Sequence, residues 1–209
     1  MKKFDLNTAT DWINRTADIL ESEKRQLTDL DAAIGDSDHG ENMARGFDAV
    51  RSKISNTVPA DISALFKTVG MTLITTVGGA SGPLYGTFFL EIAKKAIGKE
   101  ELDTAAWAEC LDAGIAGIIM RGKAELNDKT MVDAFSPAAQ ALHDNISKPL
   151  PEALRVSAET AKKGMEATIP LVARKGRASY LGERSAGHQD PGATSAYLIL
   201  NALADVFSV

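Results

Sequence analysis

The chain has 209 residues, a length that fits one large domain or two small ones. Its composition, 44% hydrophobic and 24% charged, is that of an ordinary globular protein. The net charge of −5 argues against a nucleic-acid-binding surface, and no apolar run reaches the roughly 18 residues that a transmembrane helix needs. A single cysteine, Cys110, excludes an internal disulfide, and the opening residues contain no signal-peptide core, so we expect a cytoplasmic protein that is not bound to a membrane.

Apolar residues recur at helical spacing through the first half of the chain. Thr8-Ala9-Thr10-Asp11 has the form of a capping box, and the stripe from Trp12 to Leu30 predicts one long helix that ends at Gly35. The next three helices are expected to begin near His39 or Gly40, at Pro59 to Asp61, and with Pro83 at the first helical position.

Four more helical patterns follow in the second half. Thr130-Met131-Val132-Asp133 has the form of a second capping box, and Pro149 and Pro151 separate the helix that follows it from the next one. Residues 174–192 lose the periodicity, and a loop this long in a compact domain is usually functional or disordered. The last helix, 193–207, is apolar on most sides and is expected to be central.

No segment gives a convincing strand signal. Residues 72–77 have a strand-like composition, but they continue a helical stripe. We therefore expect residues 1–209 to form a single all-α domain, a bundle of about eight amphipathic helices around one shared core.

Three carboxylates, Asp31, Asp36 and Asp38, fall in the turn between the first two expected helices. At a separation of ~4 Å and an effective dielectric of ~20, each like-charged pair costs about 4 kcal/mol, so the cluster needs screening by water or neutralisation by a cation. Counted from either Asp31 or Asp36, the spacing does not match that of an EF-hand calcium loop. Because carboxylates are hard oxygen ligands, the cluster then favours Mg²⁺. The alternative is a solvated acidic turn whose aspartates cap helix ends.

Two further loops are candidates for phosphate binding. Residues 78–83, Gly-Gly-Ala-Ser-Gly-Pro, could bring backbone amides against phosphate oxygens, although tight helix packing explains them equally well. Arg174, Lys175 and Arg177 could neutralise a phosphate or form a solvated basic loop. His39 could bind a phosphate or pair with a neighbouring aspartate. The chain lacks the Gly-x-x-x-x-Gly-Lys-Ser/Thr pattern, which excludes a P-loop.

Several motifs in a fixed order resemble one protein family. They are the aspartate turn with Asn42-Met43-Ala44-Arg45-Gly46, the 78–83 loop, Arg121-Gly122-Lys123-Ala124-Glu125, Asp128-Lys129-Thr130-Met131 and the whole 174–192 segment. Over nearly the full chain they resemble the nucleotide-binding L subunits of bacterial dihydroxyacetone kinases. The resemblance implies a barrel of eight antiparallel helices, with ADP or ATP at one end and two Mg²⁺ ions between aspartates and phosphates.

The resemblance also implies roles for individual residues. Asp31, Asp36 and Asp38 would hold the metal ions, and Arg177 would add positive charge in the transition state. Ser37 stands where relatives often carry Gly or Ala, but the metal ligands are intact. The residues expected to line the nucleotide are His39, Gly40, Glu41, Asn42, Ala80, Ser81, Gly122, Met131, Arg177, Asp190, Pro191 and Gly192.

The family has two kinds of member. In one, the L module is fused to a substrate-binding K module and exchanges free ATP. In the other, L is a separate chain that keeps its ADP, which a phosphohistidine on the M subunit of the phosphotransferase system rephosphorylates. A chain of this length is similar to the second kind, which implies a phosphotransferase subunit that serves dihydroxyacetone held covalently on the K subunit. The alternatives are the L module of a related ATP-dependent kinase and a nucleotide-state sensor that binds a transcription factor.

Overall fold

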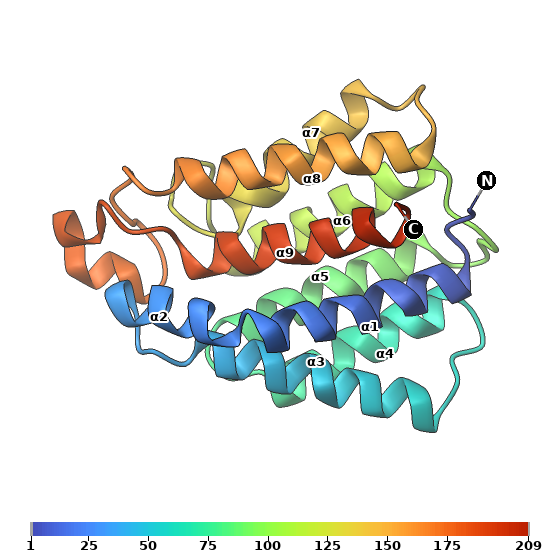
Figure 1. The fold of residues 1–209 in the computed structure, drawn as a ribbon, viewed down its shortest axis with the longest axis horizontal. Coiled ribbons are helices and arrows are strands. Elements are labelled where there is room, and N and C mark those ends of the chain that lie inside the picture. The colour runs from blue at the N-terminus through green and yellow to red at the C-terminus, as the bar shows by residue number, and fades with distance from the viewer. Residues whose placement is uncertain (1, 209) are drawn as a thin grey trace.

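The computed structural model describes residues 2–208, and over this range its secondary structure is helical apart from one isolated β-bridge between Asp5 and Glu101. The prediction of an all-α fold is confirmed. The long helices lie side by side along the longest axis of the molecule (Figure 1). In chain order the described helices are α1 (Leu6–Ser22), α2 (Lys24–Ile34), α3 (His39–Asn56), α4 (Ile62–Thr76), α5 (Ser81–Lys95), α6 (Thr104–Gly122), α7 (Val132–Asp144), α8 (Leu150–Ala167), the 3₁₀ helix η1 (Arg177–Ser185) and α9 (Pro191–Val206).

The first helix expected from the sequence is in fact two. Glu23, at φ −92° and ψ 3°, lies between α1 and α2 and belongs to neither. Its N–H still donates to the carbonyl of Ile19 at 2.8 Å, so the apolar stripe runs through the break and hides it from a periodicity argument. The predicted capping box at residues 8–11 is also wrong, because Asp5 caps α1 and accepts a hydrogen bond from the N–H of Thr8 at 2.9 Å.

Other helix starts lie within a few residues of their expected positions. Asp61 caps α4 through the N–H of Ala64 at 2.7 Å. The second capping box is half formed, because Asp133 accepts from the N–H of Thr130 at 2.7 Å while α7 begins at Val132. Pro83 is the third residue of α5 and not the first, and α9 begins at Pro191, two residues earlier than expected. Proline is tolerated at both places because the first-turn amides have no partner inside the helix.

One large hydrophobic core runs through the bundle. Trp12 is fully buried at its centre, makes edge-on contacts with Trp107 and Phe66, and donates its indole N–H to the carbonyl of Ile199 in α9 at 2.8 Å. Eleven of the sixteen residues of α9 are buried, and this helix packs against α1, α2, α7 and α8, which agrees with its predicted central place. No helix within residues 2–208 has the length and apolar character needed to span a membrane.

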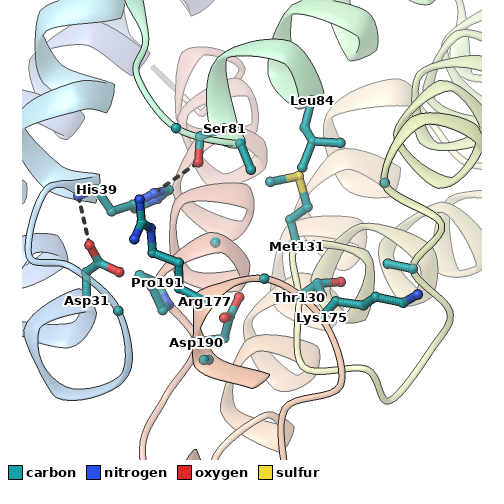
Figure 2. A pocket seen from close by; sticks show the side chains of 18 of the residues that line it. Asp31, His39, Ser81, Leu84, Thr130, Met131, Lys175, Arg177, Asp190 and Pro191 are labelled. Carbon is teal, nitrogen blue, oxygen red and sulfur yellow. Dashed lines mark hydrogen bonds between the residues drawn. The ribbon is translucent and has the colours of Figure 1, made fainter. Parts of the chain in front are cut away.

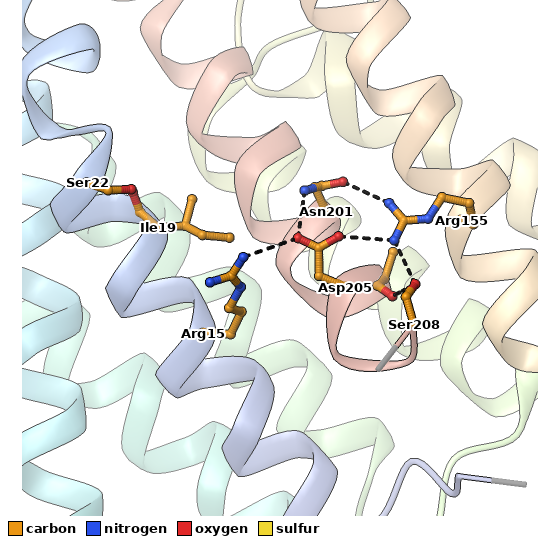
Figure 3. Close-up of polar contacts among 8 residues, drawn as sticks. Arg15, Ile19, Ser22, Arg155, Asn201, Asp205 and Ser208 are labelled. Atoms are coloured by element: carbon orange, nitrogen blue, oxygen red, sulfur yellow. Dashed lines mark hydrogen bonds and ion pairs between the residues drawn. The ribbon is translucent and has the colours of Figure 1, made fainter.

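A polar network on one side of the bundle ties α8 to α9 and α1 (Figure 3). Arg155 of α8 donates to Asp205 at 3.0 Å and to Asn201 at 3.1 Å, both on α9. Asp205 also faces Arg15 of α1, with 3.7 Å between the charged groups. Single exposed ion pairs contribute little to stability, but a shared carboxylate fixes the relative positions of three helices at once.

Glycines bring α4 and α5 into close contact. A Cβ added at Gly70 of α4 would lie 2.7 Å from the carbonyl oxygen of Gly86 in α5 and 2.8 Å from the side chain of Leu90. We therefore expect Gly70→Val to lower the free energy of unfolding by about 1–3 kcal/mol through overpacking. Lys67→Val, on the exposed face of the same helix, is the control and should cost less than about 1 kcal/mol. Urea unfolding of both variants measures the difference, and equal losses would contradict the packing argument.

Candidate functional site

A cavity of about 520 Å³ opens at one end of the bundle. The first residues of α3, α5, α7 and α9 all line it, so four helix N-termini surround one space. Such termini favour anions, because their amides and the helix dipole both present positive charge. The cavity brings together twelve of the fifteen residues predicted for the site: Asp31, Asp36, Asp38, His39, Ala80, Ser81, Gly122, Met131, Arg177, Asp190, Pro191 and Gly192.

The other three predicted residues, Gly40, Glu41 and Asn42, lie outside the lining of this cavity. Gly40 provides close packing, because a Cβ there would lie 2.0 Å from the carbonyl oxygen of Lys24. Glu41 is exposed and pairs with Lys24 at 3.6 Å. Asn42 is buried behind Gly78 and accepts a hydrogen bond from the guanidinium of Arg45. Gly40 and Asn42 therefore belong to the packing of α3 against its neighbours, and Glu41 to its surface.

Asp31 is the buried member of the acidic turn and is fixed by main-chain contacts. Its Oδ2 accepts hydrogen bonds from the N–H of Asp38 at 2.9 Å and of His39 at 3.1 Å. A Cβ at Gly35 would lie 1.9 Å from Oδ1 of Asp31, so a larger residue there would displace this carboxylate. Ser37 adopts φ +65°, a left-handed conformation that favours glycine.

The three carboxylates fit a divalent cation. One oxygen from each of Asp31, Asp36 and Asp38 lies within 4.8 Å of the others. Asp36 is exposed and pairs with Nε of Arg177 at 2.9 Å. Within the described range, 2–208, no hydrogen bond reaches Oδ1 of Asp31 or the carboxylate of Asp38. Available carboxylate oxygens beside open space suit Mg²⁺, which takes few protein ligands and completes its shell with water and phosphate.

The ring nitrogens of His39 contact two hydroxyl groups and not a neighbouring aspartate. Its Nδ1 lies 3.2 Å from Oγ of Ser81 (Figure 2), and its Nε2 lies 2.9 Å from Oγ of Ser195. Tyr85 extends this series of hydrogen bonds, because its hydroxyl lies 2.6 Å from Oγ of Ser195. Burial lowers the pKa of His39 to about 4, so the ring is neutral at pH 7. A neutral imidazole between two hydroxyls orients the Ser81 hydroxyl at the start of α5.

Two glycines of the 78–83 loop are placed by packing, and a third is not. Gly78 and Gly82 are required by packing, because Cβ atoms there would lie 2.9 Å from Oδ1 of Asn42 and 2.2 Å from the carbonyl oxygen of Val77. Gly79 is different, since it has φ +64° and open space around its missing Cβ. It lines the cavity and exposes main-chain atoms there.

An apolar wall faces the cavity on the side away from the aspartates. Figure 2 shows the side chains of Leu84 and Met131 pointing toward each other there, with Asp31 and His39 on the opposite side. Ile118, Ala124 and Val132 complete the apolar lining. Sequence reasoning missed four of these five residues, all except Met131, because their spacing is that of ordinary core positions. The cavity is thus acidic at one end and apolar at the other.

The 174–192 segment is neither structureless nor a plain solvated loop. It contains η1, and Ala178 and Leu181 pack with Ile34 and Ala173 in a small apolar cluster. Lys175 and Arg177 line the cavity from this segment. A carboxylate holds its end, because Asp190 caps α9 by accepting from the N–H of Ala193 at 2.7 Å. Burial raises the pKa of Asp190 from an ordinary 3.8 to about 7.

The family model of the DAK2 domain matches residues 33–205, which include most of the cavity lining and nine of the described helices in whole or part. The chain belongs to the DAK2 family. It is 46% identical over 195 residues to the ADP-binding subunit DhaL of the PEP-dependent dihydroxyacetone kinase of Escherichia coli K12, covering 92% of this chain and 93% of that protein. It is 42% identical to the DhaL subunit of dihydroxyacetone kinase 1 of Listeria innocua, covering 96% of both chains.

A solved structure of a DAK2-family relative has the same fold. The dihydroxyacetone kinase of C. freundii, in complex with AMP-PNP and Mg²⁺, superposes with a TM-score of 0.75 at 26% identity. The match covers 98% of this DAK2 chain and 35% of the C. freundii chain, so this chain spans about a third of that kinase.

The buried carboxyl of Asp190 predicts a pH-dependent stability of the DAK2 fold. Between pH 4 and 7 the folded protein holds a proton that the unfolded chain releases, so the free energy of unfolding falls as pH rises through this window, by something on the order of 4 kcal/mol. Asp190→Asn keeps a helix cap and removes the charge. The melting temperature of Asp190→Asn minus that of wild type should therefore increase from pH 5 to pH 8, measured in the presence of a chelator.

The matched control for this prediction is Asp61→Asn, at the exposed N-cap of α4. This variant should follow the wild-type pH dependence. If Asp190→Asn also follows the wild type from pH 5 to pH 8, the protonation assigned to the folded state is wrong.

Proposed function

We propose that this chain is the nucleotide-binding subunit of a phosphoenolpyruvate-dependent dihydroxyacetone kinase and that it holds ADP tightly. The observation that carries the proposal is the polarity of the cavity, with three clustered carboxylates at one end and an apolar wall at the other. The wall suits a purine ring, and the acidic end suits divalent cations with phosphates bound to them. The similarity to DhaL subunits over almost the whole chain supports the same assignment.

In this proposal residues 1–209 act as one cytoplasmic domain with two protein partners. A phosphohistidine on the M subunit phosphorylates bound ADP, and the ATP formed phosphorylates dihydroxyacetone on the K subunit. The nucleotide then works as a resident coenzyme and not as an exchanging substrate. We assign no general base to this chain, because the acceptor is activated on the K subunit.

The chain's own residues mainly position groups and balance charge, which is what phosphoryl transfer requires. Asp31, Asp36 and Asp38 would hold two Mg²⁺ ions, which neutralise charge on the phosphates when bound. The helix N-termini at His39 and Ser81 present amides to the same region. Arg177 lies beside Asp36 and adds a positive charge from the 174–192 segment. Met131, Leu84 and their neighbours would hold the base away from water.

Mass spectrometry of freshly purified protein tests the proposal directly. ADP or ATP should be present without added nucleotide, and a chelator should release it. Loss of nucleotide to rapid exchange with free ATP would favour the L module of an ATP-dependent kinase instead. Preparations that contain no nucleotide, and bind none with Mg²⁺, would overturn the proposal.

Asp36→Ala should abolish Mg²⁺-dependent retention of nucleotide while the helical content survives. Asp36 is exposed and pairs only at its edge with Arg177, so its removal leaves the core intact, but it removes one of three metal-binding carboxylates. Gel filtration followed by nucleotide analysis measures retention, and circular dichroism measures helicity. Asp29→Ala, an exposed carboxylate in α2, is the control and should retain nucleotide. Wild-type retention by Asp36→Ala would remove this residue from the metal site.

Arg177→Ala should slow phosphoryl transfer more than it weakens nucleotide binding. Its guanidinium neutralises charge that grows in the transition state, and its loss also frees Asp36 for a cation. We expect roughly a tenfold or greater loss of kcat with the M and K subunits present, and less than about a threefold change in nucleotide Kd. Arg184→Ala, exposed in the same η1 helix, should match wild type in both. Equal losses in kcat and Kd would contradict the role given to Arg177.

A further inference from the structure

Lys129 is a fully buried lysine at the inner edge of the cavity. Its exposed fraction is 1%, although it lies in a turn between α6 and α7. Its backbone is left-handed, at φ +63°, as is that of Asn127 at φ +72°. Left-handed conformations are costly for residues other than glycine and persist where surrounding contacts impose them. The turn is therefore held in place by something outside its own sequence.

The ammonium group of Lys129 binds main-chain carbonyls on both sides of the 174–192 segment. It donates to Thr168 at 2.8 Å and Leu171 at 3.1 Å, with Ile169 further away at 3.4 Å, all where the chain leaves α8. It also donates to the carbonyl of His188, where the chain returns toward α9. This side chain closes the base of the segment that carries Arg177, together with the main-chain hydrogen bond from the N–H of Gly187 to the carbonyl of Ile169 at 2.8 Å.

These contacts require the charged form of the side chain. Carbonyl oxygens only accept hydrogen bonds, and an ammonium group has three donors and no lone pair. Hydrogen bonds from a charged donor are roughly twice as strong as neutral ones. If the ammonium were removed, the carbonyls of Leu171 and His188 would lose their donor, and an unsatisfied buried group costs about 1–3 kcal/mol. The carbonyls of Thr168 and Ile169 would keep the N–H groups of Leu171 and Gly187 as donors.

Two further hydrogen bonds connect the surroundings of Lys129 to the cavity. Oγ of Thr168 accepts a hydrogen bond from the N–H of Asp190 at 3.0 Å, which sets the start of the Asp190-Pro191-Gly192 turn. The N–H of Arg174 donates to the carbonyl of Asp128 at 3.1 Å. On the other side, Lys129 is followed directly by Thr130 and Met131, which line the cavity.

We propose that Lys129 is the positioning residue that holds the 174–192 segment, and with it Arg177 and the Asp190 turn, against the wall formed by Met131. It acts through the carbonyls of Thr168, Leu171 and His188 and not through contact with the reacting phosphates. The expected effect of Lys129 on nucleotide binding rests on the function proposed above. The expected effect of Lys129 on the position of the 174–192 segment does not depend on any ligand.

Trypsin can report how firmly the 174–192 segment is held, because the segment contains four cleavage sites: Arg174, Lys175, Arg177 and Arg184. Lys129→Met keeps most of the side-chain volume and removes the ammonium. With ligand-free protein, brief trypsin digestion should cut this variant within 174–184 at least tenfold faster than wild type, as read by mass spectrometry. Lys163→Met, on the exposed face of α8, is the matched control and should be cut at the wild-type rate. Equal cleavage rates in folded Lys129→Met and wild type would overturn the proposal.

Chemical rescue separates charge from cavity filling. Lys129→Ala lacks three methylene groups and an ammonium, which n-propylammonium can replace, whereas n-propanol fills similar space without charge. We expect n-propylammonium, and not n-propanol, to slow tryptic cleavage of Lys129→Ala toward the wild-type rate. Equal effects of the two compounds, or no effect of either on a variant with native circular dichroism, would overturn the role of the ammonium.

Nucleotide retention gives the functional readout. Wild-type protein is assayed first, and if it binds no nucleotide, the proposed function fails while the cleavage result on Lys129 still stands. If wild type retains ADP, Lys129→Met should release it at least tenfold faster in Mg²⁺, and n-propylammonium should restore retention in Lys129→Ala. Unchanged release from a variant whose segment is cut faster would show that the segment's position does not govern binding and would overturn that part of the proposal.

Discussion

The cavity depends on how the carboxylate of Asp31 is held. The main-chain amides of Asp38 and His39 both donate to it, which folds the start of α3 back onto the end of α2. The contact is sterically allowed because residue 35 is glycine. Amides that would lack partners at a helix N-terminus are satisfied by an anion, and the helix dipole offsets part of the repulsion from Asp36 and its neighbours. An acidic cluster can therefore persist in a partly buried position beside the four helix ends.

Most of the fold follows from local signals in the sequence. The start of α4 is predictable to within a residue because its capping carboxylate, Asp61, is adjacent to the helix in the chain. The start of α1 is not, because Asp5 caps it and the capping-box pattern at residues 8–11 does not. The break at Glu23 was missed because the hydrogen bond to Ile19 and the apolar stripe both continue across it. A pattern of side chains reports which face is buried, but it does not report a change in helix direction that keeps the same face inward.

The site shows the same division between local and distant information. Asp31, Asp36 and Asp38 are near one another in sequence, so their clustering was predictable, whereas the apolar wall combines residues from α5, α6 and α7 that each look like core positions. Lys129 is the extreme case. Its carbonyl partners lie 39 to 59 positions away along the chain, and nothing in the turn around it indicates that its ammonium is buried.

The 174–192 segment is held by two positive charges in very different surroundings. Arg177, 64% exposed, pairs with Asp36 at the open end of the cavity, and such an exposed pair contributes little to stability. Lys129 holds the base of the segment from a buried position, where its loss leaves the carbonyls of Leu171 and His188 without a donor. In the function proposed above the base would stay fixed, and the guanidinium would exchange its carboxylate for a phosphate when a cation binds Asp36. A segment built this way can change partners at its tip without moving the main chain that aligns Asp190 and the helix behind it.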